Sequence, residues 1–232
     1  MNKFSVVSVD MFGTLANARS VQYRVWQSLL KDRYSNELAE QYGWRTAVLF
    51  REYQNSVIQQ NRYVPPKVIY ENCFSTLFPQ IDLDLDPKDA ARIFAQHYPL
   101  SEPFDDTMPF LDAVGKAYPI CLSSDTDEDM LGQLRQLYPF DSVFTSEKLG
   151  VYKTGSEGKF FLAVIDYYGV EPGRIIHIGD SLSDIIGASE AGIITCWLNR
   201  GGLEWAHDVK PDYEVSSLIE TASILGIEID SG

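Results

Sequence analysis

The sequence predicts an α/β fold in which an all-helical insertion interrupts a parallel sheet. From about Pro103 onward, short continuous apolar runs alternate with amphipathic stretches, a pattern typical of parallel strands covered by helices on both faces. Another apolar run stands alone near the N-terminus, and the residues between these regions show only the helical period. We therefore expect a Rossmann-like core formed by residues 1–15 and 100–232, with residues 16–99 as a separate helical domain.

The length and composition support this organisation. A chain of 232 residues suits one core with a sizeable insertion, because domains average about 150 residues. Hydrophobic residues make up 45% and charged residues 22%, which excludes a wholly disordered chain. The 33 acidic residues against 19 basic ones give a net charge of −14, which disfavours nucleic acids and membrane surfaces as partners. A small anionic substrate would need local positive charge.

The cysteines and the N-terminus indicate a cytoplasmic protein. Three cysteines without short spacings argue against a disulfide framework and against a zinc knuckle. No apolar signal segment follows Met1, and no apolar stretch reaches the about 20 residues that span a bilayer. The sequence leaves the oligomeric state open.

The first half of the chain predicts one strand followed by helices. Phe4–Val9 is short, rich in β-branched residues and followed by Gly13, so it reads as a buried strand. From Ser20 to about Tyr98 the apolar residues recur at helical spacing, as at Val21, Val25 and Leu29.

The second half predicts alternating helices and strands. The expected helices are 108–117, 127–137, 156–168, 182–191 and a last one that ends near residue 225. The expected strands are 119–123, 142–145, 174–178, 193–198 and 213–215.

Polar residues follow the predicted strands at the edge where parallel sheets bind ligands, which is the carboxyl end of the strands. Asp10 follows the first strand, and Ser124 and Asp125 follow the second. A lysine, Lys153, lies in the loop after the third. The fourth strand leads into a segment that carries two further carboxylates, Asp180 and Asp184.

These residue types suit phosphoryl transfer. The carboxylates of Asp10, Asp180 and Asp184 would repel one another unless a cation intervenes. Lys153 can offset one charge, and an oxygen-ligated Mg²⁺ can offset the rest. A carboxylate beside these cations is well placed to attack phosphorus. Gly13 would permit a tight turn whose backbone N–H groups face an anion.

Four segments resemble the four motifs of the haloacid dehalogenase superfamily. They are the run Asp10-Met11-Phe12-Gly13-Thr14-Leu15, Ser124, Lys153, and Gly179-Asp180-x-x-x-Asp184. They occur in order at the expected strand ends, and the resemblance covers essentially the whole chain. It implies that the helices of residues 16–99 are a cap that closes over the site and selects the substrate.

The resemblance also implies residue roles. Asp10 would be the nucleophile that forms a covalent intermediate, Ser124 would hold the transferring group, and Lys153 would neutralise it. Asp184 would lie in or next to the metal shell. The implied Mg²⁺ ligands are Asp10, Asp180 and the backbone carbonyl of Phe12. The expected substrate contacts are Gly13, Thr14, Asp125 and Arg51.

One position departs from the phosphatase pattern. Phosphatases of the superfamily carry an acid–base Asp two residues after the nucleophile, and this chain has Phe12 there. Positioned acid–base catalysis supplies roughly 10²- to 10⁴-fold in rate, which matters for an alkoxide but not for a halide leaving group. An aromatic residue here resembles the 2-haloacid dehalogenases, whereas Gly179-Asp180 and Asp125 depart from them.

Three functions therefore stay open. We favour a Mg²⁺-dependent phosphatase for a small phosphorylated metabolite with a good leaving group, in which Asp125 or a water replaces the missing acid. The first alternative is a 2-haloacid dehalogenase, which would use a cap arginine, Arg51 or Arg45, for the substrate carboxylate. The second is a protein that binds a metabolite or a partner without turnover.

Overall fold

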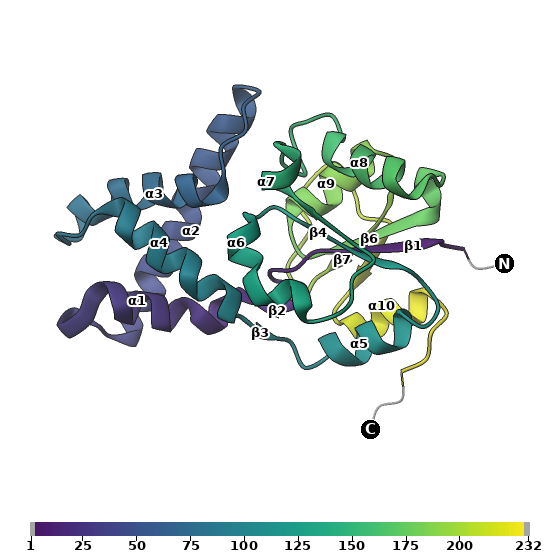
Figure 1. Cartoon of the computed structure of the whole chain (residues 1–232), viewed down its shortest axis with the longest axis horizontal. Helices are drawn as coiled ribbons and strands as arrows, with labels where there is room; N and C mark the ends of the chain where they lie inside the picture. The colour runs from purple at the N-terminus through teal and green to yellow at the C-terminus, as the bar shows by residue number, and fades with distance from the viewer. Residues whose placement is uncertain (1–2, 230–232) are drawn as a thin grey trace.

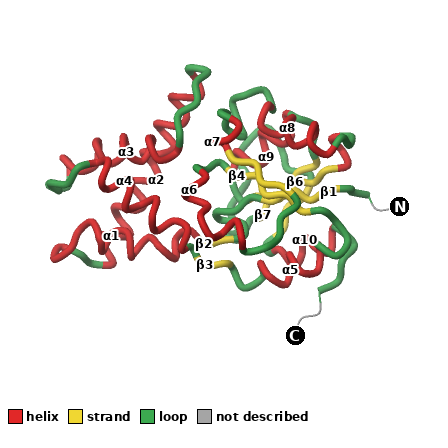
Figure 2. Tube along the Cα trace, viewed as in Figure 1, coloured by secondary structure: helices red, strands yellow, loops and turns green. Residues whose placement is uncertain are grey.

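A six-stranded parallel sheet forms the centre of the larger lobe in the computed structural model, which describes residues 3–229 (Figures 1 and 2). The strand order is β5-β4-β1-β6-β7-β8, and every neighbouring pair is parallel. The strands are β1 (Val6–Val9), β4 (Ile120–Ser124), β5 (Ser142–Thr145), β6 (Ile175–Gly179), β7 (Ile194–Leu198) and β8 (Tyr213–Val215). Because β1 lies between β4 and β6, the carboxyl ends of these three strands meet at one edge.

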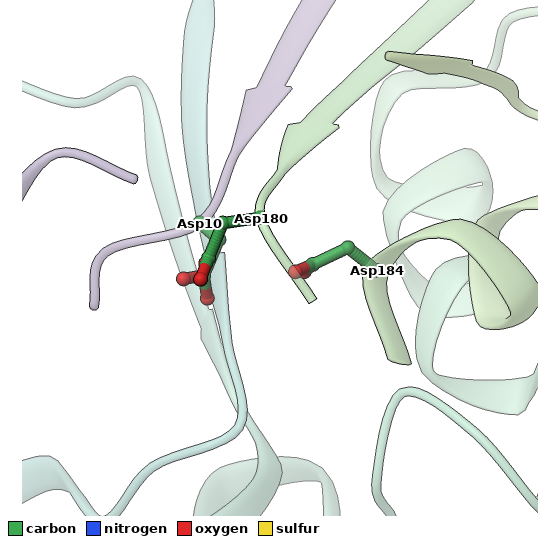
Figure 3. Close-up of side chains that lie close together, drawn as sticks. All are labelled: Asp10, Asp180 and Asp184. Atoms are coloured by element: carbon green, nitrogen blue, oxygen red, sulfur yellow. The ribbon is translucent and has the colours of Figure 1, made fainter. Parts of the chain in front are cut away.

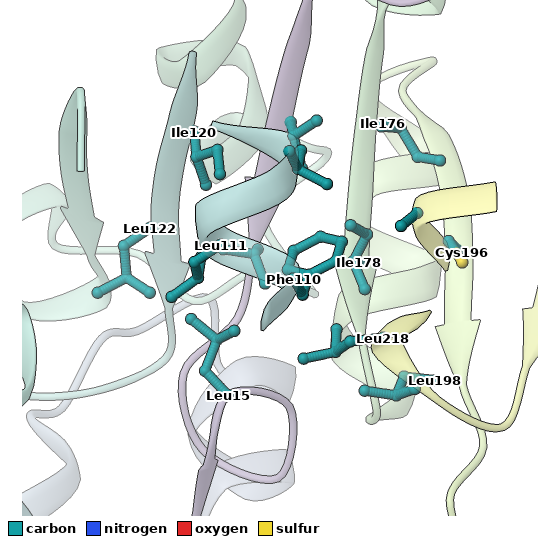
Figure 4. Packing of buried hydrophobic residues seen from close by; sticks show 14 of the residues in the cluster. Leu15, Phe110, Leu111, Ile120, Leu122, Ile176, Ile178, Cys196, Leu198 and Leu218 are labelled. Atoms are coloured by element: carbon teal, nitrogen blue, oxygen red, sulfur yellow. The ribbon is translucent and has the colours of Figure 1, made fainter. Parts of the chain in front are cut away.

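Helices cover both faces of the sheet, as the continuous apolar strands predict. On one face, α5 and α10 contribute Phe110, Leu111 and Leu218 to a core shared with β1, β4 and β6 (Figure 4). On the other face, α8 and α9 contribute Phe160 and Ala188. The helices of this lobe are α5 (Thr107–Val114), α6 (Glu128–Leu131), α7 (Ser146–Leu149), α8 (Lys159–Tyr168), α9 (Leu182–Glu190) and α10 (Leu218–Ile224).

Four helices inserted after β1 form a second lobe, the cap (Figure 1). They are α1 (Gln22–Leu30), α2 (Asn36–Gln59), α3 (Pro66–Leu77) and α4 (Pro87–His97). The chain enters and leaves the cap through a short antiparallel pair, β2 (Ala16–Asn17) and β3 (Glu102–Pro103). The cap has its own apolar core, centred on Trp26, Ile69 and Phe74.

The predicted fold class is confirmed: a parallel sheet with an inserted helical cap. The domain limits at residues 16–99 stay a prediction. The predicted helix 127–137 is wrong in part, because α6 ends at Leu131. A 3₁₀ helix, Gly132–Gln136, follows it, and the φ of 46° at Gly132 does not continue an α-helix. Within residues 3–229 no helix is long and apolar enough to cross a membrane.

Candidate active site

The carboxyl ends of β1, β4 and β6 bring the predicted site residues together. Asp10 directly follows β1, Ser124 ends β4, and Asp180 directly follows β6. The backbone N–H of Asp10 donates to the carbonyl of Ile178 at 2.9 Å, which continues the pairing of β1 with β6 up to the site. Asp10 and Asp180 consequently lie side by side, and Asp184 approaches them from the start of α9 (Figure 3).

Asp10 is buried and hydrogen-bonded through one oxygen. Its Oδ1 accepts from the ammonium of Lys153 at 2.6 Å and from the hydroxyl of Ser124 at 2.9 Å. Among residues 3–229, the side-chain hydrogen bonds to this carboxylate reach Oδ1, so Oδ2 is available to a cation or a substrate. Burial raises the pKa of Asp10 to about 6, although the Lys153 charge opposes this effect.

Lys153 is the positive charge of the site. Its side chain is 1% exposed, and its Nζ lies 2.6 Å from Asp10 and 2.5 Å from Asp184. Burial alone would lower its pKa, but the neighbouring carboxylates raise it, so the ammonium stays charged. Its backbone N–H donates to Oδ1 of Asp125 at 2.9 Å, which fixes the loop that carries the lysine.

Asp184 is held from both sides. Ser181 donates to Oδ2 through its backbone N–H at 2.9 Å and its hydroxyl at 2.5 Å, in a capping box that begins α9. Oδ1 meets Lys153 and Nε2 of His177, the latter at 3.0 Å. Burial would raise the pKa of Asp184, but the Lys153 charge and the His177 hydrogen bond hold it below its usual range. Both oxygens of Asp184 accept hydrogen bonds, and through Oδ1 Asp184 helps to orient Lys153.

Asp180 lies in a space that a glycine leaves open. A Cβ on Gly13 would stand 2.3 Å from Oδ2 of Asp180, and Gly13 has a φ of 91° that disfavours other residues. Thr14 is fully buried, and its hydroxyl donates to Oδ1 of Asp180 at 3.2 Å. Burial, with the Asp184 and Asp10 charges, raises the pKa of Asp180 to about 8.

This donor set fits a hard divalent cation. Asp10, Asp180 and Asp184 each offer a carboxylate oxygen, and these oxygens lie within 4.8 Å of one another. Lys153 is the ammonium in contact with two of the three carboxylates, so negative charge predominates in the buried site. Carboxylate oxygens are the protein ligands that Mg²⁺ prefers.

A cavity of about 300 Å³ opens above these residues between the core and the cap. Asp10, Ser124 and Lys153 line its floor, and Arg51 of α2 lines its cap side. Phe12 also lines it, with its ring centroid 4.5 Å from that of Tyr98. Arg45, the other cap arginine considered, is not among the lining residues.

Asp125 completes the polar part of this cavity. It lines the wall beside Ser124, and burial raises its pKa to about 7 against the lowering effect of Lys153. It is therefore partly protonated near neutral pH.

Two residues that support the site have no signal in the motifs. His177 is buried, as expected for a core histidine, but it contacts Asp184 through Nε2 and the hydroxyl of Ser8 through Nδ1 at 2.8 Å. Gly187 of α9 faces the loop that carries Lys153, which we call the lysine loop. A Cβ on Gly187 would stand 2.0 Å from the carbonyl oxygen of Lys153. Each of the apolar strands β1 and β6 contains one polar side chain, which could have suggested that Ser8 and His177 pair, and they are neighbours in register.

Comparison with known proteins decides the family. A model of haloacid dehalogenase-like hydrolases matches residues 4–192. The chain belongs to this family, and it is a hydrolase. The putative HAD-hydrolase YfnB of Bacillus subtilis is 24% identical over 98% of both chains. The pyrimidine 5'-nucleotidase YjjG of Escherichia coli is 36% identical over 88 residues, so the match spans only 38% of that protein.

Solved structures of this hydrolase family share the fold. YfnB bound to magnesium superposes with a TM-score of 0.84 at 18% identity, over 97% of this chain and 100% of that one. The L-2-haloacid dehalogenase of Xanthobacter autotrophicus gives 0.81 at 17% identity, over 96% and 98% of the two chains. At these identities the likeness concerns the fold alone, so both a phosphatase and a dehalogenase activity are compatible with it.

Proposed function

We propose that this hydrolase is a Mg²⁺-dependent phosphatase that acts on small phosphate esters through Asp10. The observation that carries the proposal is the acidic cluster of Asp10, Asp180 and Asp184, in contact with the Lys153 ammonium. A dehalogenase that needs no metal has no use for Asp180, whose carboxylate is kept in place by the space at Gly13 and the hydroxyl of Thr14.

Each residue has a defined task in this reaction. Asp10, Asp180 and the carbonyl of Phe12 would hold Mg²⁺, which supplies charge neutralisation at the phosphoryl oxygens. Ser124 and Lys153 hold Asp10 by its Oδ1 and bind the phosphoryl group. Oδ2 of Asp10 attacks phosphorus, the bond to the leaving oxygen breaks with its electron pair, and an aspartyl phosphate forms. A water then attacks phosphorus, the bond between phosphorus and Oδ2 of Asp10 breaks with its electron pair on the carboxylate, and the protons of the water leave with the phosphate product.

Phe12 determines which esters react fast. It offers no proton, so an alkoxide must leave without the help that an acid would give, at a cost of about 10²- to 10⁴-fold in rate. Asp125, whose raised pKa keeps part of it protonated near pH 7, is our candidate for a partial replacement, with a water as the alternative. Aryl and acyl phosphates release an aryloxide or a carboxylate, which are stable anions, so we expect these phosphates to be the preferred substrates.

Phosphate release from acetyl phosphate, 4-nitrophenyl phosphate and ethyl phosphate tests the proposal. With Mg²⁺ we expect the first two to react at least about a hundredfold faster than ethyl phosphate, in line with the missing acid. EDTA should stop all three reactions. Phosphate release that is insensitive to EDTA, or equal rates for aryl and alkyl esters, would contradict the proposal.

Phe12 favours a second candidate, a 2-haloacid dehalogenase. A halide leaves without a proton, and Arg51 lines the cavity opposite Asp10, where it could bind a substrate carboxylate. This enzyme would release chloride from 2-chloropropionate in EDTA, and it would lose that activity in Asp10→Asn. Absence of chloride under these conditions excludes the candidate.

A further inference from the structure

A second cavity, which we name the cap cavity, lies within the cap beside the catalytic one. It measures about 460 Å³, in the range of small-molecule sites, and it lies between α1, α2 and the end of α4. Ala47, Tyr70 and Tyr98 line both this cavity and the catalytic cavity. Ala47 is exposed, so a substrate whose phosphate lies at Asp10 could extend over this residue into the cap cavity.

A series of neighbouring aromatic rings runs from the catalytic cavity to the cap cavity. The ring of Tyr98 lies 4.5 Å from that of Phe12 in the catalytic cavity and 5.0 Å from that of Phe94 in the cap cavity. Tyr70 adds a further contact, with its ring 4.0 Å from that of Phe94. Trp26 and Val25 line the same cavity. This surface suits flat apolar groups, which gain from ring contacts as well as from burial.

Three polar side chains that line the cap cavity are already hydrogen-bonded within the cap. The hydroxyl of Tyr23 donates to Glu40 at 2.6 Å, and the amide of Gln22 donates to the carbonyl of Ala39 at 2.9 Å. The hydroxyl of Thr46 donates to a backbone carbonyl one helical turn earlier, at 2.8 Å. An occupant rich in hydroxyl groups would have to compete with these bonds, whereas an apolar one leaves them intact.

We propose that the cap cavity binds an aromatic leaving group, so that the substrates are phosphate monoesters of aryl alcohols of about naphthyl size. The inference rests on the proposed phosphatase function and names its substrate class. It agrees with Phe12, because an aryloxide is the kind of leaving group that needs no acid. Trp44, which also lines the cavity, is 65% exposed, so it is available to cover an occupant at the rim.

Binding of phosphonates, which cannot be hydrolysed, tests the inference directly. Calorimetric titration with Mg²⁺ should show that (2-naphthylmethyl)phosphonate binds about thirtyfold tighter than methylphosphonate, as burial of the rings in an apolar cavity implies. Ala47→Leu, on an exposed position of α2 where the cavities meet, should reduce this preference at least about tenfold. The matched variant Ala95→Leu, on the α4 face away from both cavities, should retain it.

Equal affinity of the wild type for the two phosphonates would overturn the inference, and so would an undiminished preference in Ala47→Leu. The same proteins are assayed for phosphate release from 2-naphthyl phosphate. If the binding preference is present but no ester is hydrolysed, the cavity assignment stands and the proposed function fails. If esters are hydrolysed without any preference in binding, the function stands and the cavity assignment fails.

Discussion

Asp180 is the residue on which the electrostatics of the site depends most. Asp10 and Asp184 each contact Lys153, whereas the side-chain partner of Asp180 is the neutral hydroxyl of Thr14. Burial and the neighbouring carboxylates raise its pKa to about 8, so without a cation it keeps a proton at neutral pH. A divalent ion that binds here must displace that proton.

This pKa predicts how stability depends on pH. Between pH 4 and 8 the folded protein without metal binds a proton on Asp180 that the unfolded chain releases, so its free energy of unfolding falls as pH rises. Asp180→Asn removes the contribution of this group. In EDTA the free energy of unfolding of the variant should therefore fall less steeply with rising pH than that of the wild type, and the two slopes should differ by at most about 1.4 kcal/mol per pH unit. Urea unfolding at several pH values measures both slopes, and identical slopes would contradict the assignment. Mg²⁺ should stabilise the wild type more at pH 8 than at pH 5.5.

The sequence predicts the polar residues of the motifs better than the side chains that hold these residues in place. The gathering of Asp10, Ser124, Lys153 and Asp180 at one edge of the sheet could be predicted because each lies at a strand end or in a loop beyond one and belongs to a recognisable motif. The contact of His177 with Asp184 could not, because it depends on how the start of α9 packs against β6. A histidine within an apolar strand looks the same whether it touches the site or only the core.

At the scale of elements, α9 connects two parts of the site. Its first turn holds Asp184 in the capping box, and its middle approaches the lysine loop at Gly187. The missing side chain at Gly187 lets the helix lie against the backbone of Lys153. The position of the ammonium thus depends on a glycine that lies outside the four motifs.

Gly187→Ala tests this dependence. The new Cβ would lie 2.0 Å from the carbonyl oxygen of Lys153, which is backbone and cannot move without displacing the loop. We expect phosphatase kcat to fall at least about tenfold, because small misplacements of a catalytic group are costly. Gly173→Ala is the matched control, since a Cβ there meets nothing within 4 Å. Equal kcat in the two variants would show that α9 does not position the lysine.

Regular elements were predicted well, and local breaks were not. The strands at 142–145 and 213–215 occur where the sequence predicts them, because short β-branched runs after turns leave few alternatives. The helix expected at 127–137 breaks at Gly132, where the backbone adopts a positive φ. A glycine within a helical pattern is compatible with either outcome until its neighbours are known.

At the scale of the whole molecule, hydrogen bonds at the loop between α2 and α3 help to hold the cap against the core. The Tyr152 hydroxyl of the core donates to the carbonyl of Val64 and accepts from its N–H, at the loop between α2 and α3. Nearby, the backbone N–H of Lys67 donates to Asp127 at 2.6 Å. Such contacts between distant segments cannot be read from the sequence, and neither can the cap cavity, which arises only when α1, α2 and α4 pack together.

Tyr152→Phe should weaken this attachment. The change removes both hydrogen bonds to Val64 and leaves its backbone groups unpaired at the cap–core boundary, at a cost of about 1 kcal/mol in the free energy of unfolding. Urea unfolding measures the loss, and Tyr167→Phe, at a tyrosine that is 58% exposed, serves as the control. A loss no larger than that of the control would mean that the hydroxyl contributes nothing to holding the cap.

The net charge of −14 concerns the whole surface rather than the site. Three acidic residues form the candidate cation site, so most of the excess lies elsewhere. A large polyanion would meet that surface, whereas the small phosphate ester that we propose would meet Lys153 and Arg51 within the cavity. The charge is therefore compatible with the small substrate that we propose.

The central claim is that Asp10 becomes phosphorylated during turnover. The direct measurement is acid quenching of the enzyme with Mg²⁺ and ³²P-labelled acetyl phosphate, followed by location of the label by peptide mass spectrometry. We expect a hydroxylamine-sensitive label on the peptide that contains Asp10, absent in EDTA and absent in Asp10→Asn. Turnover without any labelled Asp10, or a label that persists in Asp10→Asn, would contradict it.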